Sequence, residues 1–330
     1  MPKTSTDLIR HALNGPTMGT RWTALFHAEV GLDPAPIRAA LQSTVNAVDA
    51  AMSTWKPDSD LMRLNRAAEG IWLSVPAGLA EVIGLGLRIG IASGGAFDMG
   101  MGDAVRAWGF GPEDAHAEAI RTAIAAPRCP AHELLELDRA AGRVRKRGPV
   151  ALDLNGIAKG YGVDQLAGTL RGFGISAFLV GIDGEMRASG LRPDGAPWVV
   201  AVELPDPERR APHSVLALEN AAVATSGDYR HSVTVQGLRL SHTMDPATGA
   251  PLRSSLASVT VVAGSCAEAD AWATALMVSG PAAGGALAAR LGLDALFLIR
   301  AAGGIRTHAV GRLFCDPIAA KAAQERAAPG

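Results

Sequence analysis

The sequence predicts an α+β fold, with mixed or antiparallel sheets and helices packed against them. Two observations favour this class. Between residues 177 and 263, short runs of apolar and β-branched residues alternate with turn residues, which is typical of strands joined by direct turns. Before and after this segment, apolar residues recur every three or four positions, as on one face of a helix. A doubly wound parallel sheet is disfavoured because it needs a crossover after each strand.

The N-terminal half is predicted to consist mainly of helices. The clearest covers residues 34–53, where the apolar positions of one face are Ile37, Leu41, Val45, Val48 and Met52. The other expected elements, in chain order, are helices over 77–93 and 113–125 and strands over 134–137, 144–147 and 150–152. The helix that follows is predicted to end near Gly172 or Gly174, because glycine commonly terminates helices.

The C-terminal half is predicted to contain most of the strands. They cover 177–182, 198–204, 215–218, 221–224, 232–235 and 258–263. Two helices, over 267–279 and 282–291, and a strand over 295–299 complete the pattern. No internal repeat is visible, and the Ala-rich, polar residues 319–330 are predicted to form a C-terminal tail.

The composition excludes several classes of protein. The chain has 330 residues, of which 48% are hydrophobic, so it can bury a substantial core. A net charge of −1 disfavours binding to nucleic acid or to an anionic membrane surface. The three cysteines are far apart and include no Cys-x-x-Cys pair, which argues against a disulfide framework and against a zinc site. They suit a reducing compartment.

No segment is apolar over a length that could cross a bilayer, so no membrane insertion is expected. The first residues have neither the apolar core of a signal peptide nor a twin arginine, and no lipidation cysteine. The chain as given is therefore expected in the cytoplasm, and in the periplasm if a leader has been removed. The sequence does not predict the oligomeric state.

The most informative segment is residues 153–164, Asp-Leu-Asn-Gly-Ile-Ala-Lys-Gly-Tyr-Gly-Val-Asp. It places two carboxylates, one lysine and three glycines where a predicted strand leads into a predicted helix. A helix N-terminus offers free backbone N–H groups and positive dipole, and glycine allows a ligand to approach closely. These features indicate a phosphate site. A P-loop is excluded, because Lys159 precedes a glycine and no Ser or Thr follows the lysine.

Two clusters rich in glycine and turn residues accompany this segment. The first, 95–102, holds Asp98 and leads to Trp108, where a flat ring system could stack. A glycine-rich turn beside a tryptophan is, however, also ordinary architecture. The second joins 225–229 with 241–249, and its Asp-Pro and Thr-Gly pairs are accounted for equally well as turns.

A third cluster begins the helix predicted after residue 265. Ser265 and Glu268 have the spacing of a capping box. Asp270 and Thr274 stand four residues apart, so a carboxylate and a hydroxyl share one helix face. Such donors suit a hard cation such as magnesium, which also keeps waters and binds substrate phosphate. The structural alternative is that Thr274 bonds to its own helix and that Asp270 is solvated.

Together these clusters resemble one family, the ApbE family of FAD:protein FMN transferases. The resemblance extends from about residue 18 to residue 315 and depends on motifs in a fixed order. The matching motifs are Met18-Gly-Thr20; Met52-Ser-Thr-Trp-Lys-Pro-Asp-Ser59 with Leu64-Asn65; Gly95-Ala-Phe-Asp98 with Trp108-Gly-Phe-Gly111; 153–164; Ala224-Thr-Ser-Gly-Asp-Tyr229; His242 with Asp245-Pro-Ala-Thr-Gly249; and Asp270 with Thr274.

The resemblance implies an activity and a domain plan. The activity is a magnesium-dependent transfer of the FMN half of FAD to a Thr or Ser hydroxyl of an acceptor flavoprotein, through a phosphoester bond, with release of AMP. A membrane electron-transfer subunit is the expected acceptor. The plan is an N-terminal extension over 1–17, an ApbE-like domain over 18–318 and the tail over 319–330, with the FAD site in a cleft between two intimate subdomains.

The resemblance also implies roles for individual residues. The metal, magnesium or alternatively manganese, is expected on Asp270, Thr274 and the backbone carbonyl of Gly156. His242 is the expected base for the acceptor hydroxyl, and Asp270 is catalytic through the metal. The residues expected to line the site for FAD, which is the substrate, are Met18, Trp55, Ala96, Phe97, Asp98, Asp153, Lys159 and Met244.

The chain departs from the family pattern in three places. Asn155-Gly156 replaces a common Gly-Gly pair beside the expected metal, Asp103 adds a charge near the expected flavin site, and 180–185 differs from the usual Asn-x-Gly-Gly-Asp. Two other functions remain open. One is a metal-dependent FAD pyrophosphatase that produces FMN and AMP with water as the acceptor. The other is an FAD-binding module without turnover, which would need neither His242 nor the metal ligands.

Overall fold

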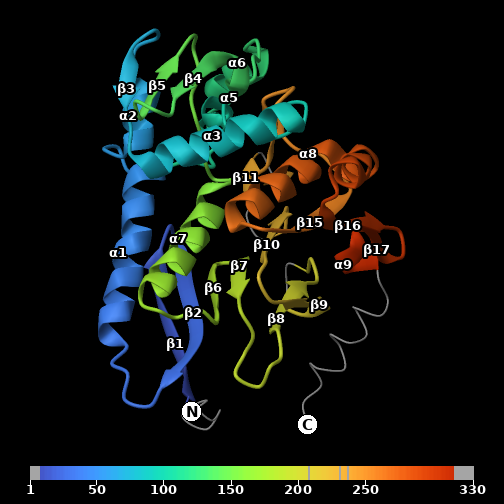
Figure 1. Cartoon of the computed structure of the whole chain (residues 1–330). Helices are drawn as coiled ribbons and strands as arrows, with labels where there is room; N and C mark the ends of the chain where they lie inside the picture. The colour runs from blue at the N-terminus through green and yellow to red at the C-terminus, as the bar shows by residue number, and fades with distance from the viewer. Residues whose placement is uncertain (1–7, 207–208, 230–231, 236–237, 316–330) are drawn as a thin grey trace.

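An eight-stranded, fully antiparallel sheet forms the centre of the computed structural model, which describes residues 8–206, 209–229, 232–235 and 238–315 (Figure 1). Its strand order is β1-β2-β6-β7-β10-β15-β16-β17. The strands are β1 (Leu8–Thr17), β2 (Thr20–Glu29), β6 (Phe178–Ile182), β7 (Glu185–Ser189), β10 (Ala222–Gly227), β15 (Leu256–Ala263), β16 (Asp294–Ala301) and β17 (Gly304–Val310). Because every neighbouring pair is antiparallel, the predicted α+β class is confirmed.

Three long helices cover one face of this sheet: α1 (Ala35–Met52), α7 (Ala158–Gly172) and α8 (Cys266–Leu291). All five apolar positions predicted for the first helix are buried in α1. Helix α8 is Ala-rich and lies between the sheet and a second apolar cluster, so it is buried on more than one side. Its backbone breaks at Gly280, where φ is 77°, and Pro281 follows. The two helices predicted on either side of this point are therefore confirmed.

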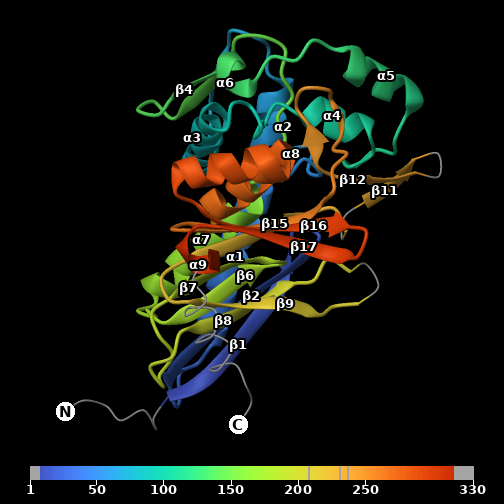
Figure 2. The same cartoon turned by 90° about the vertical axis from the view of Figure 1, so that its right-hand side faces the viewer.

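The opposite face of the sheet is covered by a two-stranded sheet of β8 (Trp198–Glu203) and β9 (Pro212–Leu218). Its inward side chains alternate along β8, where Trp198, Val200 and Val202 are buried. Figure 2 shows β8 and β9 on the side of the central sheet away from α8. The central sheet is thus buried on both faces.

A second, smaller unit packs on the far side of α8 and shares an apolar core with α1 and α8. It contains α2 (Asp60–Arg66), β3 (Trp72–Ser74), α3 (Ala77–Ala92), α4 (Gly102–Ala107), α5 (Ala117–Ala125), α6 (Ala131–Leu134), β4 (Leu135–Asp138) and β5 (Arg143–Lys146). Two hairpins, β11 (Ser232–Val235) with β12 (Leu238–Ser241) and β13 (Met244–Asp245) with β14 (Ala250–Pro251), lie on the same side (Figure 2). A short α9 (Arg312–Cys315) ends the described part.

The structure differs from the predicted elements at several places. Residues 8–17, predicted as part of an N-terminal extension, form the edge strand β1 and pair with β2 along ten positions. The predicted strand over 150–152 is irregular backbone, and the predicted helix over 113–125 begins at Ala117. The predicted tail, 319–330, lies outside the described residues. No helix in the described part is long and apolar enough to span a membrane.

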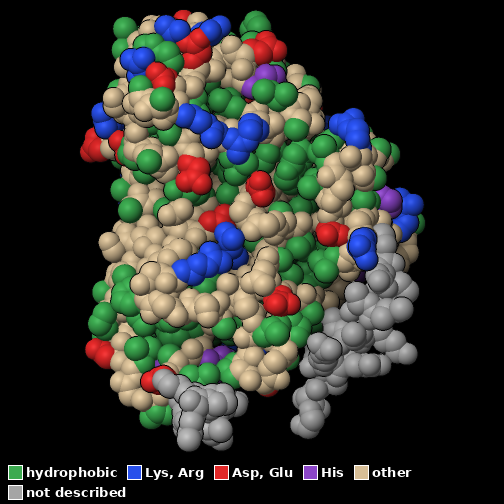
Figure 3. Space-filling model, viewed as in Figure 1, with side chains coloured by type: hydrophobic (Ala, Val, Ile, Leu, Met, Phe, Trp, Pro, Cys, Tyr) green, Lys and Arg blue, Asp and Glu red, His purple; other side chains and the backbone are tan. Residues whose placement is uncertain are grey.

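Charged side chains of both signs are interspersed on the face shown in Figure 3, without a continuous basic area. This distribution agrees with the formal net charge of −1. That face therefore has no positively charged area large enough to bind a long polyanion.

Candidate active site

The start of α8 is fixed by two side-chain caps. The Ser265 hydroxyl accepts a hydrogen bond from the backbone N–H of Glu268 at 3.3 Å, so the N-cap expected from the sequence is present. The Asp164 carboxylate, reaching from α7, accepts hydrogen bonds from the backbone N–H groups of Cys266 at 2.9 Å and Ala267 at 3.0 Å. Asp164 therefore caps α8 and holds α7 against it, rather than pointing toward a ligand.

The close crossing of α7 and α8 positions Asp270. A Cβ at Gly160 would lie 2.3 Å from the carbonyl oxygen of Cys266, so only glycine fits at this crossing. The Gly160 N–H donates to Oδ2 of Asp270 at 3.0 Å, and the Asp270 side chain is 5% exposed. This carboxylate lies at the junction where sequence alone indicated a phosphate site.

Thr274 and Gly156, two of the residues predicted to bind the metal, lie next to each other. A Cβ at Gly156 would lie 3.1 Å from Oγ1 of Thr274 and 3.4 Å from the Phe97 ring. The Thr274 hydroxyl also lies 3.0 Å from the Ser226 hydroxyl, which comes from β10. The structure therefore brings the 153–164 segment, the glycine-rich loop and one face of α8 together at a single point.

The electrostatics of Asp270 favour a bound cation. The pKa of its carboxyl group is raised to about 7, chiefly by burial and also by the nearby Glu185 charge, although Lys159 and the Gly160 amide act in the opposite direction. A buried carboxylate with one hydrogen bond is stabilised when a cation binds to it. The described residues contain no group of three or more His, Cys, Asp or Glu side chains that could hold a metal. A cation bound beside Asp270 would therefore need hydroxyl or carbonyl oxygens as further protein ligands, and magnesium accepts such donors.

Asp153 lies at the end of an irregular segment that is held by side-chain and backbone bonds. The Asn65 side chain binds the backbone of Leu152 in both directions, donating to its oxygen at 2.9 Å and accepting from its N–H at 2.7 Å. The Asp153 N–H donates to the carbonyl oxygen of Met99 at 2.8 Å. Its carboxylate accepts two hydrogen bonds from Asn155, both at 2.9 Å, and burial raises its pKa to about 6.

Phe97 and Asp98, two predicted site residues in the glycine-rich loop, are held by contacts with other parts of the protein. The Phe97 side chain is 4% exposed and reaches Gly156, as described above. Oδ1 of Asp98 accepts from the N–H groups of Gly100 at 2.8 Å and Ala131 at 3.1 Å, which orders the loop. Burial raises the pKa of the Asp98 carboxyl group. Ala96 lies partly exposed beside them.

The glycine-rich loop and the 241–249 segment form one cluster. Met244 is 6% exposed and packs with Met101 and Ala104. The indole N–H of Trp108 donates to the carbonyl oxygen of Gly249 at 2.9 Å. The His242 ring meets the Phe110 ring edge-on, with centroids 6.5 Å apart. Residues of both sequence clusters therefore pack together, and His242 contacts this group through Phe110.

The remaining predicted site residues, Met18, Trp55 and Lys159, differ in their exposure and in their contacts. Met18 occupies the β1–β2 turn with φ at 45°, and its side chain reaches toward Gly162 of α7. Trp55 is 60% exposed. The Lys159 ammonium group binds Oε1 of Glu185 at 2.6 Å and lies 3.9 Å from Oδ2 of Asp183. The nearby carboxylates raise the Lys159 pKa, although burial acts against them.

Three further residues shape the site although their roles are not predicted from the sequence. Gly160 fits the helix crossing, Ser226 contacts the Thr274 hydroxyl, and the 3%-exposed Glu185 binds Lys159. The only sequence signal for Glu185 is its position in 180–185, which departs from the family pattern.

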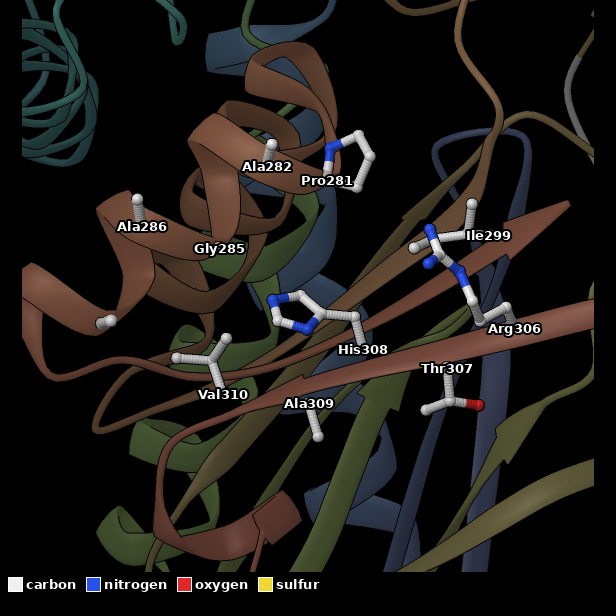
Figure 4. A pocket seen from close by; sticks show the side chains of 11 residues that line it. Pro281, Ala282, Gly285, Ala286, Ile299, Arg306, Thr307, His308, Ala309 and Val310 are labelled. Carbon is white, nitrogen blue, oxygen red and sulfur yellow. The ribbon is translucent and has the colours of Figure 1, made fainter. Parts of the chain in front are cut away.

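A surface pocket of about 650 Å³ lies elsewhere, between the second half of α8 and the strands β16 and β17 (Figure 4). Its walls are mainly small apolar residues, with His308 and Arg306 as the polar side chains that can carry charge. None of the residues that line it belongs to the predicted site.

Known proteins resemble this chain over most of its length. A family model described as the ApbE family matches residues 18–297. The FAD:protein FMN transferase of Klebsiella pneumoniae (strain 342) is 35% identical over 306 residues, which cover 89% of this chain and 86% of that protein. The FAD:protein FMN transferase of Escherichia coli (strain K12) is 35% identical over 274 residues, with coverage of 82% and 78%.

Solved structures show the same likeness in three dimensions. The flavin transferase ApbE from Vibrio cholerae has a TM-score of 0.81 and 34% identity, covering 92% of this chain and 97% of that one. The apo form of the Pseudomonas stutzeri flavinyl transferase ApbE has a TM-score of 0.80 and 35% identity, with coverage of 92% and 95%.

The fold and the matching relatives define an α+β enzyme of the transferase class. The chain belongs to the ApbE family. The family, fold class and enzyme class predicted from the sequence are therefore confirmed.

Proposed function

We propose that this chain transfers the FMN half of FAD to a Thr or Ser hydroxyl of an acceptor flavoprotein, in a magnesium-dependent reaction that releases AMP. The relatives named as FAD:protein FMN transferases support FAD as the substrate and a protein as the acceptor. The observation that carries the proposal is a pair of contacts between two neighbouring turns of the chain. Gly156 lies beside Thr274 and Phe97, and Gly160 binds Asp270, which is four residues before Thr274 on α8. A membrane electron-transfer subunit is the proposed acceptor.

The residues of the site suit the cation that this chemistry needs. Asp270 supplies one buried carboxylate, Thr274 one hydroxyl and Gly156 a backbone carbonyl, and this set matches the preference of magnesium for oxygen ligands. A cation held by these residues would supply positive charge to stabilise the charge that develops on the leaving AMP phosphate. Manganese accepts the same donors.

The transfer itself is a displacement at the phosphorus of the FMN half. A bond forms between the acceptor oxygen and that phosphorus, and the phosphorus–oxygen bond to AMP breaks. The hydroxyl proton must leave as the oxygen attacks, and we assign its acceptance to the imidazole of His242. The phosphate of AMP departs with the bonding electron pair, so atoms and charges balance.

The same site could pass FMN to water, which would make the enzyme an FAD pyrophosphatase. Incubation with FAD, magnesium and candidate acceptors distinguishes the two activities. Transfer should give a flavin-fluorescent acceptor band that survives denaturation. Free FMN and AMP without any labelled acceptor would favour the hydrolase, and intact FAD throughout would favour a binding module without turnover.

A further inference from the structure

The buried charges next to the proposed cation site have an unusual arrangement. Lys159 projects from the first turn of α7, and its positive charge lowers the pKa of Asp270. Its ion pairs, however, are with Glu185 at 2.6 Å and Asp183 at 3.9 Å. Within the described residues, no ion pair of 4.0 Å or less joins Lys159 to Asp270.

Glu185 is almost completely enclosed. The residue is 3% exposed, and its Oε1 receives the Lys159 ammonium group. Its Oε2 is buried and has no hydrogen-bond partner among the described atoms. Acidic side chains are seldom buried without full pairing, because a desolvated charge is costly. Within the described residues, Lys159 is the cation that compensates the buried Glu185 charge.

Lys159 and a divalent cation would compete for the same carboxylate. A lysine ammonium group on a flexible stem can move toward whichever carboxylate attracts it most strongly. If it paired with Asp270, it would neutralise the main charged ligand of the proposed cation site. The short contact with Glu185, at the start of β7, holds the Lys159 ammonium group away from Asp270.

We propose that Glu185 is a positioning residue that restrains Lys159, so that the Asp270 carboxylate stays available to a divalent cation. The inference rests on the proposed function, because it assumes that Asp270 binds the cation. It assigns Glu185 an effect through Lys159 and not through direct contact with metal, FAD or acceptor.

The test measures binding of Mn²⁺ alone to the full chain, by the loss of the free-ion EPR signal. In Glu185→Gln the ammonium group is released toward Asp270, and the dissociation constant for Mn²⁺ should rise at least about tenfold, the effect of a one-unit pKa shift. In the double variant Lys159→Met/Glu185→Met no ammonium group remains, and most of the lost Mn²⁺ affinity should return.

The double variant separates positioning by Glu185 from direct attraction of the cation and from a purely structural role. If Glu185 attracted the cation directly by its charge, Lys159→Met/Glu185→Met would bind Mn²⁺ more weakly than Lys159→Met, whereas the proposal requires these two variants to bind it alike; a weaker double variant would overturn the proposal. If the Lys159–Glu185 pair were only structural, thermal unfolding of Glu185→Gln would shift without a change in Mn²⁺ affinity, which would also overturn it. Glu136→Gln is the matched control, because Glu136 pairs with Arg145 and Arg147 in the separate three-stranded sheet.

A single variant covers the case in which Glu185→Gln fails to fold. Lys159→Met removes the competing ammonium group, so it should bind Mn²⁺ at least as tightly as the wild type, and weaker binding would contradict the proposal. If Asp270→Ala bound Mn²⁺ as tightly as the wild type, the cation site of the proposed function would itself be refuted. The two failures are therefore distinguishable.

Discussion

The backbone N–H of Gly160 donates a hydrogen bond to Oδ2 of Asp270 at 3.0 Å, although 110 positions separate the two residues. The bond exists because α7 and α8 cross at Gly160, where a side chain would meet the Cys266 carbonyl group at 2.3 Å. The helix crossing and the placement of the Asp270 carboxylate therefore depend on the same glycine.

Gly160→Ala should destabilise the protein and disturb the site together. The added methyl group would clash with the backbone carbonyl of Cys266, which cannot rotate away as a side chain could. Overpacking of this kind lowers the free energy of unfolding by about 1–3 kcal/mol. Chemical denaturation measures this loss, and Mn²⁺ binding should weaken in parallel as Asp270 moves. Gly168→Ala is the matched control on α7, since nothing lies within 4 Å of its Cβ position and alanine favours a helix by about 1 kcal/mol. Equal stability for the two variants would contradict the crossing argument.

Asp164→Ala should cost more stability than an ordinary surface substitution. The carboxylate caps the first two N–H groups of α8 and pairs with Arg187, and all three partners lose their acceptor in the variant. Loss of a cap together with a part-buried ion pair predicts a decrease of about 2–4 kcal/mol in the free energy of unfolding. Asp194→Ala, which breaks the exposed pair with Arg192, serves as the control and should change stability little. Similar losses in both variants would show that the cap is unimportant.

The contributions of Asp98 and Asp138 to the free energy of unfolding should depend on pH in opposite directions. Burial raises the folded-state pKa of Asp98, so the folded state binds its proton more tightly, and stability falls as pH rises from the ordinary value of 3.8 through the raised pKa. The Ala141 N–H and Arg143 lower the pKa of Asp138, so its contribution is present at higher pH and is lost as pH falls through that lowered pKa.

Two asparagine variants check these signs by chemical denaturation across pH 3 to 7, a range chosen around the carboxyl pKa values. Asp98→Asn keeps an oxygen that can accept from its two N–H partners and should remove part of the decline in stability toward neutral pH. Asp138→Asn should reduce the loss of stability at acid pH. If both variants changed the pH profile in the same direction, the assigned environments would be wrong.

The sequence predicted those features that depend on local spacing. The one-sided burial of α1 follows from its apolar period, and the break at Gly280 follows from a Gly-Pro pair. Asp270 and Thr274 share a face because four residues make one helical turn. By contrast, β1 was missed because apolar and polar residues are mixed at its exposed positions, so this edge strand has no clear alternation.

The relations between distant segments could not be predicted from spacing alone. Asp153 and Asp164 begin and end the same glycine-rich run, yet Asp153 faces its own loop through Asn155 while Asp164 caps α8. Whether a carboxylate of this run bonds within its own loop or caps α8 depends on how α7 packs, and that packing is a property of the whole fold. The burial of Glu185 is similarly hidden, since glutamate is usually exposed and its sequence neighbours give no contrary signal.

Asp270→Ala should abolish transfer while the fold remains intact, because the main charged ligand of the proposed cation site is gone. Thr274→Val keeps the shape of the side chain but removes a neutral ligand, so the magnesium concentration for half-maximal transfer should rise about tenfold, with a smaller effect at saturation. Ser279→Ala removes another hydroxyl of α8, one that bonds to the Ala275 carbonyl group, and should leave magnesium dependence unchanged. Full transfer by Asp270→Ala, or a shift in Ser279→Ala equal to that of Thr274→Val, would refute the metal assignment.

His242→Ala should slow the chemical step more than it weakens FAD binding. A general base contributes about 10²- to 10⁴-fold, so single-turnover transfer at saturating FAD should fall within that range while the dissociation constant for FAD changes little. His308→Ala is the control, because His308 lines the separate pocket beside β17 and has no place in the proposed site. A residual rate that becomes independent of pH in His242→Ala would support proton acceptance by the imidazole. An effect confined to FAD affinity would mean that His242, beside Phe110, only positions the substrate and that another group accepts the proton.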